Sequence, residues 1–163
     1  MIDLLPKIDE WFSQGEEIAV ATVIRVLGSA PRPVGARMIV SSEGRMAGSV
    51  SGGCVETTVY EEMMDVLEGG APRLLHFGIT DDMIWDVGLA CGGTIDVFVQ
   101  KLDPELLASL VKHVERDEPV ALTTVVAGRV EGEGLEVGDS SLVTRDGLVP
   151  DSEVLGVMQI AQE

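Results

Sequence analysis

Residues 36–67 read ARMIVSSEGRMAGSVSGGCVETTVYEEMMDVL, and this stretch decides the expected fold. Its first half holds two strand-like runs, 36–41 and 45–50, which a short turn containing Glu43-Gly44 joins into a hairpin. From Cys54 onward the apolar positions recur at three- and four-residue steps, which is typical of a helix, until Gly69-Gly70 ends it. The segment Ser51-Gly52-Gly53 therefore connects a hairpin to the start of a helix.

The flanking sequence alternates between strands and helices in the same way. Asp103-Pro104-Glu105 has the residues of a helix start: a capping carboxylate, a proline in the first turn and an acid that matches the helix dipole. The expected helices are 2–12, 54–67, 103–116 and 152–163, and the expected strands are 17–27, 36–41, 45–50, 72–79, 94–102, 119–127 and 129–137, with a last hairpin around Asp146-Gly147. We therefore expect an α+β fold with a mixed or largely antiparallel sheet, hairpins and two or three packing helices, as a single domain over residues 1–163.

The charge of the chain limits the partners that it can have. Its 163 residues carry a formal net charge of −17, which repels the phosphates of nucleic acids and an anionic membrane surface alike. The stretch from Ala19 to Cys54 has the opposite sign, +3, which leaves −20 for the remainder. We expect no nucleic-acid partner, whereas a small anion would bind in the positive stretch unless its arginines serve solubility alone.

The sequence also predicts where the protein works. The N-terminus has no basic region followed by an apolar one, and no apolar stretch is long enough to span a bilayer. Its two cysteines, Cys54 and Cys91, have neither the spacing of a disulfide framework nor that of a zinc ribbon. We expect a cytoplasmic protein with reduced thiols and no membrane span.

Three glycine-rich strings lie on or beside expected connections: GSAPRPVGA at 28–36, GSVSGGCVE at 48–56 and GLACGG at 88–93. The middle string ends at a helix N-terminus, where free backbone N–H groups and the positive end of the helix dipole suit an anion. The structural alternative is that Gly52 and Gly53 merely permit a tight turn. Ser49 and Ser51 are expected to bond to backbone or ligand, because the nucleophile pattern G-x-S-x-G is absent.

The two thiols are candidates for chemistry. Cys54, in the first turn of the expected helix, would have its thiolate favoured by the helix dipole, and Cys91 has little neighbouring bulk to shield it. Together they suit a soft metal or a sulfur-bearing ligand if the fold brings them close, although buried and inert cysteines are commoner. His76 and His113 could complete a zinc site with them, but none of the four stands at ligand spacing.

In the three strings the sequence resembles the XdhC/CoxI family, whose pattern runs G-S-x-P-R-x-x-G-A, G-S-V-S-G-G-C-V-E and G-L-x-C-G-G. All three occur here in order, and the resemblance extends over about residues 18–102. It implies a maturation chaperone rather than an enzyme. Such a protein binds molybdenum cofactor, in its molybdopterin or nucleotide form, as cargo, and assists its sulfuration and its insertion into a xanthine dehydrogenase- or CO dehydrogenase-type molybdenum hydroxylase.

The same resemblance implies site residues. Arg32 and the Ser51-Gly52-Gly53 loop would hold the anionic end of the cofactor, and Cys54 or Cys91 would lie near the molybdenum. Cys91 is the preferred metal contact and candidate thiol, because the helix start already gives Cys54 a structural role. The expected cofactor-binding residues are Arg32, Ser49, Ser51, Gly52, Gly53, Cys54, Cys91, Gly92 and Gly93.

The implied partners are a molybdenum hydroxylase apoenzyme and a cysteine desulfurase or other sulfurtransferase. Many family members carry a second, C-terminal Rossmann-like domain, whereas this sequence stops at Glu163. We therefore expect either a separate Rossmann-domain subunit or a chain that works alone, for instance as a homodimer. Two alternatives stay open: a thiol enzyme that transfers sulfur or senses oxidant through Cys54 and Cys91, and a non-catalytic scaffold between a sulfurtransferase and the apoenzyme.

Overall fold

A computed structural model of the chain describes residues 2–78, 92–128, 136–144 and 147–148. They belong to two compact units, Met1–Leu102 and Asp103–Glu163. That the two units act as one domain stays a prediction. No helix within the described ranges is both long and apolar enough to cross a bilayer.

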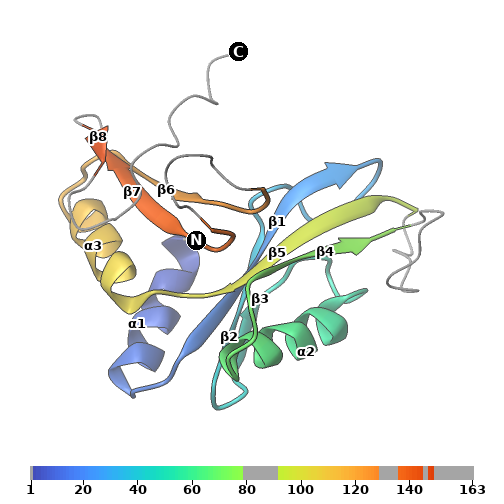
Figure 1. Ribbon diagram of the computed structural model, residues 1–163, viewed down its shortest axis with the longest axis horizontal. Coiled ribbons are helices and arrows are strands. Elements are labelled where there is room, and N and C mark those ends of the chain that lie inside the picture. Colours follow the sequence, from blue (N-terminus) through green and yellow to red (C-terminus); the bar gives the residue numbers. More distant parts are fainter. Residues whose placement is uncertain (1, 79–91, 129–135, 145–146, 149–163) are drawn as a thin grey trace. The chain divides into compact units, whose positions relative to one another are not determined.

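The first unit is built on a five-stranded sheet with the order β3-β2-β1-β5-β4 (Figure 1). Every pair of neighbouring strands described in it is antiparallel, so the α+β class and the largely antiparallel sheet expected from the sequence are confirmed. The elements are η1 (Ile2–Leu4), α1 (Leu5–Ser13), β1 (Ile18–Leu27), β2 (Arg37–Ser41), β3 (Met46–Gly48), α2 (Glu56–Leu67), β4 (Arg73–Phe77) and β5 (Thr94–Lys101).

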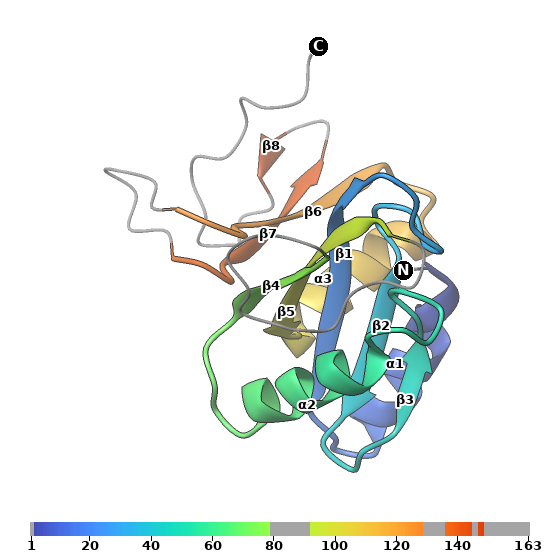
Figure 2. The same cartoon turned by 90° about the vertical axis from the view of Figure 1, so that its right-hand side faces the viewer.

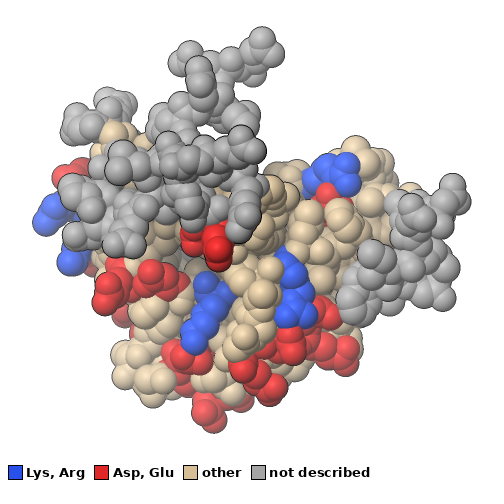
Figure 3. Space-filling model, in the orientation of Figure 1, with Lys and Arg blue, Asp and Glu red and all other residues tan. Residues whose placement is uncertain are grey.

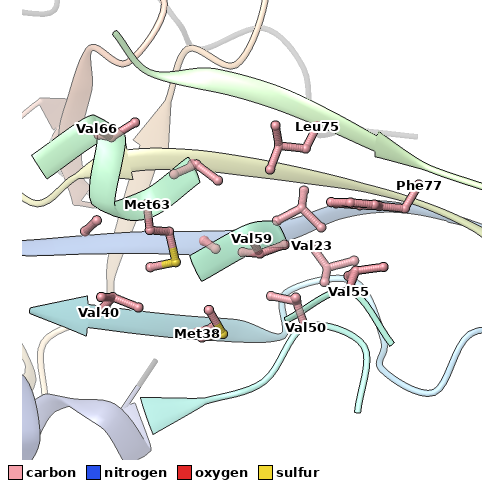
Figure 4. Packing of buried hydrophobic residues seen from close by; sticks show 14 of the residues in the cluster. Val23, Met38, Val40, Val50, Val55, Val59, Met63, Val66, Leu75 and Phe77 are labelled. Carbon is pink, nitrogen blue, oxygen red and sulfur yellow. The ribbon is translucent and has the colours of Figure 1, made fainter. Parts of the chain in front are cut away.

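Helix α2 covers one face of this sheet (Figure 2). Alternate residues of each strand point to the same face, so β1 presents the small side chains Ala19 and Ala21 to the helix and leaves room for it to approach. From α2, Val59 and Met63 are fully buried against them (Figure 4). Burial of each such aliphatic side chain contributes about 1.5–3 kcal/mol, and this interface fixes the start of α2 relative to the sheet.

Two arginines tie the helices of the first unit to its strands. Arg45, in the turn between β2 and β3, lies 5.0 Å from the centre of the Trp11 ring of α1, and its Nε donates to Glu16 over 3.1 Å. Arg73 of β4 donates from Nη1 to Glu62 of α2 over 2.8 Å. Both contacts hold an edge strand or its turn against a helix.

The second unit contains α3 (Pro104–Glu115) and a three-stranded sheet of β6 (Val120–Thr124), β7 (Ser140–Thr144) and β8 (Gly147–Leu148), in that order. Asp103 caps α3 as expected, because its Oδ1 accepts from the amides of Glu105 (2.8 Å) and Leu106 (3.3 Å). The pairing of β7 with β8 confirms the last hairpin.

One expected strand of this unit is wrong where it can be tested. Residues 136 and 137, the last two of the strand expected over 129–137, are not in a strand, and β6 pairs instead with β7. A turn forms there because the Asp139 side chain accepts from the Glu136 amide over 2.7 Å and Gly138 has a φ of 102°. Residues 129–135 and the expected helix 152–163 lie outside the described part of the chain.

Candidate functional site

The glycine-rich strings meet at one end of the five-stranded sheet. There β1 ends at Leu27 opposite Thr94, the first residue of β5, and Gly48 of β3 lies opposite Met38 near the start of β2. Strand β4 ends at the same place, since Phe77 pairs with Ile95 (Figure 1). The three strings therefore leave the sheet in the same direction, although Gly48 lies level with Ala21, six residues before the end of β1.

Close backbone contacts join the first string to the other two. A Cβ atom on Gly93 would lie 2.1 Å from the carbonyl oxygen of Ser29, and one on Gly52 would lie 3.5 Å from the Cβ atom of Pro31. Ser29 and Pro31 are two residues apart, a span of at most about 7 Å. The first string therefore lies between the second and the third, and Gly93 must be glycine for its main chain to come this close.

The second string folds around a carboxylate of its own chain. The amides of Ser51 and Gly52 each donate to Glu56 Oε1 over 2.9 Å, and the amide of Gly53 donates to Oε2 over 2.7 Å. The hydroxyls of Ser49 (2.7 Å to Oε1) and Ser51 (to Oε2) donate as well. The sequence predicted free amides at this helix start, and that prediction was wrong because Glu56 reaches back to them.

The two serines complete this network. Ser49 Oγ accepts from the amide of Gly52 over 2.9 Å, and Ser51 Oγ accepts from the amide of Val55 over 3.0 Å. Ser51 is fully buried. Gly52 and Gly53 have φ values of 79° and 117°, which side chains with a Cβ atom rarely adopt. The serines are thus backbone-bonding groups, which is one of the two roles expected for them.

The environment of Glu56 keeps it ionised. Partial burial raises the pKa of its carboxyl, but the hydrogen bonds from the Ser51 and Ser49 hydroxyls, together with those from the backbone, outweigh this effect and lower the pKa to about 2. A stable negative charge consequently sits in the first turn of α2, where it also matches the helix dipole.

Cys54 lies on this loop with an exposed side chain. The sequence predicted Cys54 within the first turn of α2. It instead precedes the N-cap residue Val55 and lies just before that turn. Gly92 is exposed and Gly93 is buried. Cys91 lies outside the described residues, so its distance from Cys54 stays open.

The positive stretch of the sequence is largely neutralised within the fold. Arg25 pairs with Asp96, and Arg45 pairs with Glu16 and Glu10. On the face drawn in Figure 3, basic side chains accordingly form separate small patches with acidic ones beside them.

The other two arginines of that stretch differ in exposure. Arg37 is partly buried, and this burial lowers its pKa, an effect that the charge of Asp3 opposes. Arg32 is exposed, next to Pro31, and forms no ion pair with the described part of the chain. That it binds an external anion stays a prediction.

Neither histidine belongs to a zinc site in the described residues. His76 Nδ1 bonds to Asp96 Oδ1 over 2.7 Å, and His113 bonds to Glu118 Oε2 over 2.8 Å. Among the residues that the structure describes, no group of three or more His, Cys, Asp or Glu side chains could hold a metal ion.

Sequence reasoning missed two groups at this end of the first unit. Arg25, Asp96 and His76 form a row across β1, β5 and β4 that depends on strand register, which no local pattern reveals. Glu56 gave no local signal either: it directly follows the N-cap residue Val55, and the position three residues before it is Gly53 and not the serine or threonine of a capping box.

Comparisons with known proteins bear on the family of this chain. Residues 11–78 match the XdhC and CoxI family, a range that holds the first two glycine strings and not the third. The molybdenum cofactor insertion chaperone PaoD of Escherichia coli K12 is 34% identical over 115 residues, which cover 69% of this chain and 36% of that protein. A probable xanthine dehydrogenase subunit of Bacillus subtilis 168 is 33% identical over 100 residues, 60% of this chain and 30% of that protein.

A solved structure shares the fold. The crystal structure of a xanthine dehydrogenase from Bacillus halodurans superposes with a TM-score of 0.64 at 24% identity, over 85% of this chain and 41% of that one. This chain thus spans well under half the length of each of these relatives. Residues 11–78 of the protein therefore belong to the XdhC and CoxI family, as its glycine strings predicted.

Proposed function

We propose that this protein binds molybdenum cofactor of the molybdopterin type as cargo, and assists its sulfuration and its insertion into a xanthine dehydrogenase- or CO dehydrogenase-type molybdenum hydroxylase. The observation that carries the proposal is the meeting of the glycine strings, where Ser29 contacts Gly93, Pro31 approaches Gly52, and Cys54 is exposed beside them. A flat, phosphate-bearing pterin with a soft metal needs a surface of this kind, with little side-chain bulk, a cation and a thiol.

Each residue has a proposed part in holding the cofactor. Arg32 would bind the phosphate, because its guanidinium is exposed and makes no ion pair with the described residues. Gly52, Gly53, Gly92 and Gly93 would let the pterin approach the main chain. The amides of the second string already donate to Glu56, so Ser49 and Ser51 would support the loop while its exposed surface contacts the cofactor.

The thiols have separate proposed parts. Cys91 would contact the molybdenum or its sulfur, an assignment that rests on its place next to Gly92 in the sequence. Cys54 would be the second, exposed thiol. The proposal describes a chaperone that retains its cargo stoichiometrically and does not turn it over.

The partners are part of the proposal too. They are the molybdenum hydroxylase apoenzyme and a cysteine desulfurase or other sulfurtransferase, in the cytoplasm. The names of the relatives support such a role, since one is a molybdenum cofactor insertion chaperone and another a probable xanthine dehydrogenase subunit. A separate Rossmann-domain subunit or a second copy of this chain is a further proposed partner.

The test is purification from a host that makes molybdenum cofactor, followed by assays for bound pterin by fluorescence and for molybdenum by mass spectrometry. The parent should carry both in near-equal amounts, and R32A and C91A should lose most of them. R116A, which removes an exposed arginine of the second unit, and S109A, which removes a small, partly exposed side chain of α3, are the matched controls. A parent free of pterin would overturn the proposal, and a C91A variant that holds cofactor as tightly as the parent would overturn the role of Cys91.

The exposure of Cys54 also favours a second candidate, a thiol enzyme that moves sulfur or senses oxidant through Cys54 and Cys91. Oxidation or sulfur loading would then change the mass of the protein in a way that a reductant reverses, and C54A would abolish the change. Stoichiometric pterin without any such mass change would reject this candidate in favour of the chaperone.

A further inference from the structure

The carboxylate of Glu56 occupies the place that the sequence suggests for a ligand. Three consecutive amides, those of Ser51, Gly52 and Gly53, converge on its two oxygens. Consecutive amides in a glycine-rich turn before a helix are the arrangement with which proteins hold phosphate groups. In this protein the anion comes from the chain itself, two residues beyond Cys54.

The network extends further than an ordinary helix cap. In a capping box the acid three residues into the helix bonds to a single backbone amide. Glu56 instead accepts from the Ser49 and Ser51 hydroxyls in addition to the three amides. Its one carboxylate is thus hydrogen-bonded to residues along the segment 49–53. A cap needs none of these extra bonds, which indicates that the shape of the loop is what they maintain.

This network determines how Cys54 is presented. The residue before it is anchored by the bond from the Gly53 amide to Glu56, and the residue after it by the bond from the Val55 amide to Ser51 Oγ. Cys54 between them has an exposed side chain. A thiol on a short segment that is fixed on both sides keeps a defined direction, which a free glycine loop would not give it.

We propose that Glu56 is a positioning residue: its carboxylate fills the anion cradle of the second glycine string, excludes ligand phosphate from the loop amides, and holds the loop so that Cys54 is presented to solvent. The inference does not depend on cofactor binding. It would stand if the protein bound no pterin, and it would fail separately from the proposed function.

The experiment compares E56Q with the parent by two measurements. The first is hydrogen exchange of the amides of residues 51–53, and the second is the rate of Cys54 alkylation by iodoacetamide across pH, in a C91A background so that one thiol reacts. E61Q is the matched control, because Glu61 is an exposed acid of the same helix. E56D keeps the charge and tests whether a carboxylate restores the loop.

We expect E56Q to exchange these amides on the order of tenfold faster, because a neutral amide side chain cannot accept all the bonds that the carboxylate takes. Cys54 should be alkylated more than about twofold more slowly at neutral pH, since the freed loop no longer holds its thiol toward solvent. E61Q should match the parent in both measurements, and E56D should recover part of the protection. Unchanged exchange in E56Q, or faster exchange with an unchanged alkylation rate, would overturn the proposal.

A measurement on the parent covers the case in which E56Q does not fold. Inorganic phosphate is titrated while the amide signals of residues 51–53 are followed by nuclear magnetic resonance. Signals that do not move support the occupied cradle. Saturable movement of these signals would show that phosphate displaces Glu56, and the proposal would be wrong.

Discussion

Glu56 carries a charge that acid can remove only below the range in which most carboxylates titrate. The hydrogen bonds of its loop lower its pKa from 4.5 to about 2 in the folded protein. Between these two values the folded protein keeps the group ionised while the unfolded chain binds a proton. The bonds therefore contribute stability that is fully present above about pH 4.5 and is lost as the pH falls toward about 2.

This charge leads to a prediction about acid stability. Between pH 5 and about pH 2.5, the free energy of unfolding of the parent should fall more steeply than that of E56Q. The extra loss should be about 1–2 kcal/mol, after allowance for screening of a group that is partly exposed. Urea unfolding at each pH measures it, and E61Q should keep the slope of the parent. Parallel slopes for the parent and E56Q would show that the hydrogen bonds between the Glu56 carboxylate and its loop do not stabilise the fold.

The same residue shows what single positions reveal before a structure exists. The glycines at 52 and 53 indicated a turn at the start of a helix, and both have positive φ values there. The backbone amides of that turn were expected to be free. A local sequence pattern shows that several amides lie close together, but it does not show which side chain accepts hydrogen bonds from them. Position 53 is a glycine, so the Ser/Thr-x-x-Glu pattern of a capping box, which would have pointed to Glu56, is absent.

At the level of elements, the contact of Gly93 with Ser29 sets how closely the start of β5 approaches the end of β1. G93A would force a Cβ atom to within 2.1 Å of the Ser29 carbonyl oxygen, so one of the two strings must shift. We expect a loss of about 2–3 kcal/mol in stability, as for other overpacked sites, and faster amide exchange at residues 28–31. Urea unfolding and hydrogen exchange measure the two effects.

G92A is the control for this variant. Gly92 has no atom within 4 Å of an added Cβ, but its φ of 72° makes alanine strained, with a cost of about 1–2 kcal/mol. The variant should lose less stability than G93A and leave exchange at residues 28–31 as in the parent. Equal effects of the two substitutions on those amides would refute the role of the close contact.

The elements themselves were largely predictable in the first unit. Strand β5 showed a period of two and α2 a period of three to four, and both formed, although α2 begins at Glu56, two residues later than expected. In the second unit the strand expected over 129–137 can be tested only at residues 136 and 137. Both belong to a turn that runs to Asp139, because an aspartate and a glycine there satisfy the backbone locally.

At the level of the whole molecule, 28 acidic residues against 11 basic ones make repulsion between like charges a general cost of folding. Raising NaCl from about 20 mM to about 300 mM shortens the screening length and should raise the thermal midpoint by about 2–4 °C. Thermal unfolding followed by circular dichroism measures the midpoint, and KCl should act like NaCl. A midpoint that falls with salt would mean that ion pairs such as those of Arg45 and Arg73 outweigh the repulsion.

The two outer strands of the five-stranded sheet have a consequence for storage and overexpression. Strand β3 is three residues long and β4 is five, so in the described part of the chain neither border offers a long ladder of open backbone groups. Such ladders are where partly opened molecules join into fibrils. For this reason we expect this chain, with 45% hydrophobic residues, to aggregate through unfolded molecules and not through edge-to-edge strand pairing of folded ones.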